Sequence, residues 1–106
     1  MRRKDLATLS VAELVEAYAQ TGIAEDKAEM DDDLPKRNRL CLKMFAIGKE
    51  LKSRPGDQRR ALLTLYDHPN VEVRLMAAKC TLAVAPIKAR KVIESIAASK
   101  RFPYAG

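Results

Sequence analysis

One histidine, His68, is the only side chain of this 106-residue chain whose ordinary pKa lies near neutral pH, so it is the first candidate for acid–base chemistry. It stands in the segment Asp67-His68-Pro69-Asn70, and the neighbouring sequence contains no serine or cysteine that could serve as its nucleophile. We therefore interpret His68 as a turn residue. No catalytic residue is assigned, and the chain is not expected to be an enzyme.

Residues that commonly bind metals or nucleotides lack the required spacing. Cys41, Cys80 and the one histidine form no C-x-x-C or H-x-x-x-H pair, so no zinc site is predicted. Glu25, Asp26 and Glu29 offer carboxylates at helical spacing, but the Glu-x-x-His element of di-iron bundles is missing. No glycine-rich phosphate-binding motif occurs. We predict no metal and no cofactor, and we interpret both cysteines as small, reduced core residues.

Positive charge is the strongest chemical signal in the sequence. The chain carries 20 Lys and Arg against 14 Asp and Glu, a net charge of +6. Residues 1–34 carry four basic and nine acidic residues, while residues 35–106 carry 16 basic and 5 acidic ones, net +11. These charges either form solvated helix faces, or the acidic third folds against the basic remainder and neutralises part of it. The basic residues predicted to bind a partner are Arg59, Arg60, Lys88, Arg90 and Lys91.

Capping signals predict where the first two helices begin. Ser10-Val11-Ala12-Glu13 has the spacing of a capping box, and an apolar stripe at helical spacing follows it. Gly22 either ends this helix or lies inside a longer one that runs to about Met30, and the helix formers after it favour the longer helix. Asp33, followed by Pro35 in the first turn, predicts a second helix over 34–51, apolar around more than half its circumference.

Three further helices are predicted after the breaker cluster Ser53-Arg54-Pro55-Gly56. One runs from Asp57 through Tyr66, one from Asn70 towards Pro86, and one over 86–99, which leaves 100–106 as a tail. Short connections between amphipathic helices place neighbours antiparallel. The predicted fold is all-α, with about five helices in stacked antiparallel hairpins. We treat 1–106 as one domain, with 1–34 as an acidic capping region and 57–99 as its core.

The third and fourth helices resemble one HEAT repeat, a helical hairpin that stacks on similar hairpins. The similar segments are Ala61-Leu62-Leu63-x-Leu65, the turn Asp67-His68-Pro69-Asn70, and Val71-Glu72-Val73-Arg74-x-x-Ala77-Ala78-x-x-x-Leu82. The resemblance implies a HEAT/armadillo-like α-α superhelix. It also implies a structural role for Arg74, bonded to acids or carbonyls of neighbouring turns. The small pair Ala77-Ala78 would let the two helices approach closely, and atypical ends would cover the core of so short a solenoid.

Over nearly its whole length the chain is also similar to a small family of uncharacterised bacterial proteins, a domain of unknown function with HEAT-like repeats. The resemblance rests on Arg59-Arg60-Ala61-Leu62-Leu63, on Asp67-His68-Pro69-Asn70, on Val73-Arg74-Leu75-x-Ala77-Ala78 and on Ala85-Pro86. It implies the fold but no activity, because a fold carries no function of its own.

Two functions are compatible with these observations. The first is a protein-interaction module that binds an acidic protein or a second copy of itself. The alternative is sequence-independent binding of nucleic acid through the basic residues, which would displace counterions from phosphates. No stretch approaches the length of a membrane span and no secretory signal is recognisable, so we expect a cytoplasmic protein that does not enter membranes.

Overall fold

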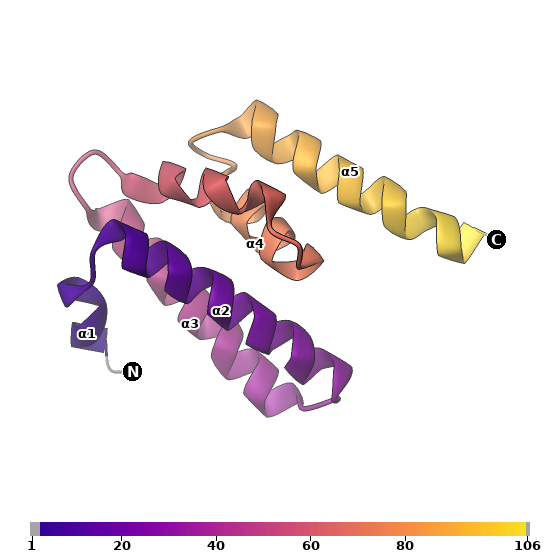
Figure 1. Cartoon of the computed structure of the whole chain (residues 1–106), viewed down its shortest axis with the longest axis horizontal. Helices are drawn as coiled ribbons and strands as arrows, with labels where there is room; N and C mark the ends of the chain where they lie inside the picture. Colours follow the sequence, from indigo (N-terminus) through magenta and orange to yellow (C-terminus); the bar gives the residue numbers. More distant parts are fainter. Residues whose placement is uncertain (1–2, 106) are drawn as a thin grey trace.

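The structure, a computed structural model, describes the backbone of residues 3–105 and the side chains of residues 6–99. Within 3–105 it has six helices and no strand. They are α1 (Arg3–Thr8), α2 (Val11–Met30), α3 (Leu34–Ser53), the 3-10 helix η1 (Gln58–Asp67), α4 (Val71–Thr81) and α5 (Pro86–Ala105). Figure 1 shows α2, α3, η1, α4 and α5 running back and forth as successive neighbours, while the short α1 packs against α3. This all-helical arrangement confirms the predicted fold class and is consistent with a helical superhelix.

Helices α2 and α3 form the central hairpin, and both begin as predicted. The Ser10 hydroxyl accepts a hydrogen bond from the Glu13 amide, and the Glu13 carboxylate accepts one from the Ser10 amide, which completes the capping box. The Asp33 carboxylate accepts from the Lys36 amide at the start of α3. Gly22 lies within α2, as the longer alternative predicted. A side chain at this position would meet the buried Val73 of α4, which explains why a glycine stands here.

The segment after residue 57 differs from the predicted α-helix, because η1 is a 3-10 helix throughout. Its two buried residues, Leu62 and Leu65, are three apart, and residues at this spacing lie on one face of a 3-10 helix. Asp57 caps η1 through the Arg59 amide from a left-handed backbone conformation, with φ of 53°. Both leucines thus join the hydrophobic core.

Two terminal elements also differ from expectation. Helix α1 was not predicted; Arg54 anchors its end by donating to the carbonyls of Leu6 and Leu9 at 3.0 and 2.8 Å. The backbone from residue 100 was expected to be a tail, but it continues α5 to Ala105, while Gly106 lies outside the described residues. Helix α5 packs chiefly against α4, at one edge of the molecule (Figure 1).

The core lies where α2, α3, η1 and α4 meet. Its fully buried side chains include Leu14, Ile47, Leu51 and Leu62, and Ala77 and Ala78 are also fully buried, as a closely packed helix pair requires. The molecule is flat, about 48 × 33 × 18 Å. None of the helices described is long and apolar enough to cross a membrane.

Candidate functional site

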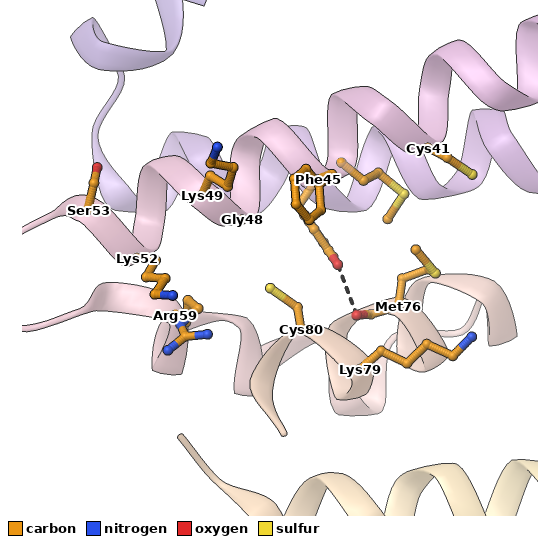
Figure 2. Close-up of a pocket in the computed structure, with 12 residues that line it drawn as sticks. Cys41, Phe45, Gly48, Lys49, Lys52, Ser53, Arg59, Met76, Lys79 and Cys80 are labelled. Carbon is orange, nitrogen blue, oxygen red and sulfur yellow. Dashed lines mark hydrogen bonds between the residues drawn. The ribbon is translucent and has the colours of Figure 1, made fainter. Parts of the chain in front are cut away.

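A groove of about 770 Å³ lies between α3 on one side and η1 and α4 on the other; we call it the α3–α4 groove. Apolar side chains and two thiols make up most of its lining. Figure 2 shows Phe45 of α3 and Cys80 of α4 on its opposite walls. The apolar part of the lining consists of Tyr18, Cys41, Met44, Phe45, Gly48, Met76 and Cys80.

Four cationic side chains and Ser53 complete the lining, and no acidic residue belongs to it. Lys49 and Lys52 stand one turn apart on α3, Lys79 stands on α4, and Arg59 stands at the start of η1. The three lysines are exposed and form no ion pair with any described residue, whereas Arg59 binds Asp57 at 2.6 Å. The groove therefore presents three lysines outside any such ion pair around an apolar floor, of which Lys52 also interacts electrostatically with Asp57.

Phe45 gives the groove an exposed apolar edge. Its side chain is 67% exposed although α3 is the central helix, and the ammonium of Lys49 lies 5.9 Å from the centre of its ring. Leu42, one turn earlier on α3, is 69% exposed. The apolar surface thus continues from the groove onto the outer face of α3, which a ligand confined to the groove would leave uncovered.

Of the two cysteines predicted to be core residues, Cys80 packs against the core, whereas Cys41 does not belong to the residues packed against it. Both are free thiols, both are only partly buried, and both line the groove. Burial raises the pKa of the Cys80 thiol, and neither the hydrogen bond with Tyr18 nor the charge of Arg59 reverses this direction. Burial likewise raises the pKa of Cys41. At neutral pH the groove holds thiols rather than the thiolates that a nucleophile requires.

The floor is held in place by a bond between helices. The Tyr18 hydroxyl of α2 donates to the Met76 carbonyl of α4 at 2.9 Å, and burial raises the pKa of this phenol, so it stays a donor. Arg59 is positioned by the Asp57 carboxylate, whose pKa it lowers through this hydrogen-bonded ion pair. These bonds hold Tyr18 and Arg59 in place within the lining of the groove.

The residues predicted to bind a partner fall in different places. Arg59 lines the α3–α4 groove, whereas Arg60, Lys88, Arg90 and Lys91 are exposed and do not line it. The last three stand on α5, which does not pack closely against η1. The structure thus does not bring the five together as one lining, and their binding role stays a prediction.

His68 and Arg74 have structural partners. The Nδ1 atom of His68 accepts from the Asn70 amide at 3.0 Å, and Arg74 donates to the His68 carbonyl at 2.7 Å. His68 is therefore part of the turn before α4, as predicted, and Arg74 bonds to carbonyls of that turn, as the resemblance implied. Among residues 6–99, no group of three or more His, Cys, Asp or Glu side chains is placed to hold a metal ion.

A buried carboxylate for which no role was predicted lies on α2 and interacts electrostatically with Cys41 of the groove lining. The side chain of Glu25 is fully buried, and its Oε2 atom lies 3.2 Å from the Arg37 Nε atom. Neither carboxylate oxygen accepts a hydrogen bond from a described group, and the Glu72 carboxyl of α4 interacts with it. Burial and Glu72 raise the pKa of Glu25 to about 7, against the opposing charge of Arg37.

Arg37 also forms the ion pairs that join the acidic third of the chain to the basic remainder. Its Nε atom lies 3.2 Å from Glu25 and 3.5 Å from Glu29, both on α2. No other cation of residues 35–99 forms an ion pair with an acid of residues 6–34. Among the described residues, ion pairing between the two parts is thus confined to one arginine, and the lysines of the α3–α4 groove stay outside it.

Sequence analysis missed the lysines and Phe45 as site residues. One feature of the sequence could have indicated Phe45. The apolar residues of 34–51 surround more than half of the helix, which is more apolar surface than one helix can bury against one core. Phe45 and Leu42 are two large apolar side chains of this helix that stay exposed. The position of α4 across the groove from α3, which sets Lys79 opposite Lys49 and Lys52, has no local signal in the sequence.

The comparisons agree with this architecture. Residues 12–106 match the family described as a domain of unknown function, DUF2019. The crystal structure of the protein RPA1889 from Rhodopseudomonas palustris CGA009 is similar, with a TM-score of 0.86 and 48% sequence identity over 92% of this chain and 81% of that one. No curated protein matches the chain significantly. Since the family match spans most of the sequence, the chain belongs to the DUF2019 domain family.

Proposed function

We propose that the protein is a non-enzymatic, HEAT-like interaction module of the cytoplasm that binds an acidic protein partner through the α3–α4 groove. The observation that carries the proposal is the composition of the groove: an apolar lining of about 770 Å³, a cationic rim and no acid. A surface of this kind gains affinity from apolar burial and selects its partner by charge. The exposed edge at Phe45 favours a macromolecule over a small ligand.

The states of the reactive side chains support a binding role rather than catalysis. The ring of His68 is occupied in its turn, and the two thiols that line the groove have raised pKa values. A nucleophile needs an adjacent base that activates it, and the lining of the groove supplies none.

A photo-crosslinking amino acid at position 45 tests the proposal in the cells of origin. Position 87 is the matched control, because Ile87 is 74% exposed, apolar and outside the groove. We expect the crosslinker at position 45, but not at position 87, to capture a defined protein. Adding Lys49→Glu and Lys52→Glu should abolish this adduct. Identical adducts at both positions, or none at position 45, would contradict the proposal.

A second candidate function, polyanion binding, is supported by the exposed cations of α5. Lys88, Arg90 and Lys91 are exposed and form no ion pair with a described residue. Fluorescence anisotropy of a labelled duplex and a single strand, titrated from about 50 to 200 mM salt, measures this binding. Neutralising the three α5 cations should then weaken binding and reduce the salt slope by about 3. Neutralising Lys49, Lys52 and Lys79 instead is the control with equal charge change.

A further inference from the structure

We infer that the α3–α4 groove accepts an amphipathic helix whose apolar stripe is flanked on both sides by carboxylates. The inference rests on the proposed function, since it specifies the segment that a protein partner would present. Its grounds are the length of the groove, the arrangement of charge across it and the chemistry of its floor.

The length of the groove suits a helix of about three turns. Its lining on α3 extends from Cys41 to Ser53, which at about 1.5 Å per residue corresponds to roughly 18 Å. The opposite wall is formed by Arg59 of η1 and by residues 76–80 of α4. A trench walled by helices offers the ridges and grooves into which another helix packs.

Charge is distributed across the groove in the order cation, apolar floor, cation. Lys49 and Lys52 stand on the α3 wall, and Lys79 and Arg59 stand on the other (Figure 2). When a partner helix packs its apolar stripe against Met44 and the groove floor, the residues on either side of that stripe face the two walls of the groove. Carboxylates on both flanks would meet the lysines, which form no ion pair with a described residue.

The two ends of the groove differ in charge. Figure 2 shows Lys52 and Arg59 facing each other at one end, whereas Cys41 and Met76 lie towards the other. Asp57 forms its ion pair with Arg59 and interacts only electrostatically with Lys52, so the first end keeps a net positive charge. Methionine adapts its shape to different apolar side chains, so Met44 and Met76 suit an apolar anchor from the partner.

Anisotropy with labelled peptides and the full chain tests the inference. The probe is a peptide of roughly 15 residues, long enough to form a helix, with leucines at i, i+3, i+4 and i+7 and glutamates on both flanks. One control peptide has the same composition scrambled so that the leucines share no face. The other replaces every glutamate by glutamine. We expect the probe to bind, the scrambled peptide not to bind, and the glutamine peptide to bind about tenfold more weakly, from the loss of several exposed ion pairs.

Protein variants locate the site. Phe45→Glu places a like charge and removes an apolar edge where the probe would lie, so affinity should fall more than about tenfold. Ile87→Glu makes the same change on α5, at a side chain of similar exposure, and should leave affinity unchanged. Lys52→Gln with Lys79→Gln should remove the preference for glutamate over glutamine while retaining binding of both peptides. Equal binding of all three peptides, or equal loss in both glutamate variants, would overturn the inference.

The crosslinking experiment separates failure of this inference from failure of the proposed function. Mass spectrometry of the adduct at position 45 identifies the segment of the partner that occupies the groove. An acidic amphipathic helix supports the inference. A captured segment that is extended, neutral or basic overturns it but leaves the proposed function standing, and the absence of a specific adduct overturns both.

Discussion

Replacement of Glu25 by glutamine tests the account of the buried carboxylate. The folded pKa of Glu25 is about 7, above its ordinary value of 4.5, because burial and Glu72 disfavour the charged form. Between pH 4.5 and about pH 7, the folded protein therefore keeps a proton on Glu25 that the unfolded chain has already released. Glu25 stabilises the fold fully below pH 4.5, and this contribution is lost as the pH rises through 7. The total loss is about 3 kcal/mol.

Urea denaturation between about pH 5 and pH 8 measures the effect. The free energy of unfolding of the wild type, relative to Glu25→Gln, should fall by about 2 to 3 kcal/mol over this range, since glutamine cannot ionise. In thermal unfolding the difference amounts to on the order of 10 °C. Glu29→Gln is the matched control, because Glu29 contacts the same Arg37 but is half exposed. Parallel curves for the wild type and Glu25→Gln across the range would refute the reasoning.

Three further substitutions test the packing. Gly22→Ala should cost roughly 1 kcal/mol in a urea titration despite the better helix propensity of alanine, because the new Cβ atom would lie 2.9 Å from the stiff side chain of Val73. Ala77→Leu should cost about 1 to 3 kcal/mol, and a cost near zero would contradict the close packing of α4. Arg54→Ala removes two hydrogen bonds to the end of α1, so the amides of residues 6–9 should exchange hydrogen much faster, while those of α4 stay protected.

Local chemistry made the helix starts predictable. Ser10, Asp33 and Asn70 each cap the helix expected from the sequence, because a capping side chain bonds to an amide only two or three residues away. The 3-10 form of η1 could not be predicted in this way, since it depends on where α2, α3 and α4 require Leu62 and Leu65 to lie. Helix α1 is short and is anchored by Arg54, which is 45 or more residues away in sequence.

The charge of the α3–α4 groove could likewise not be predicted from the sequence alone. Net charge of the segment 35–106 predicted an acidic partner, but net charge does not say which cations remain free after folding. Which cations remain free depends on ion pairs such as Arg59 with Asp57, which neutralises a residue that the sequence predicted to bind a partner. It also depends on how far the acidic third lies from Lys49, Lys52 and Lys79. Because Arg37 forms the only ion pairs between α2 and the described part of residues 35–106, the three groove lysines stay available to a partner.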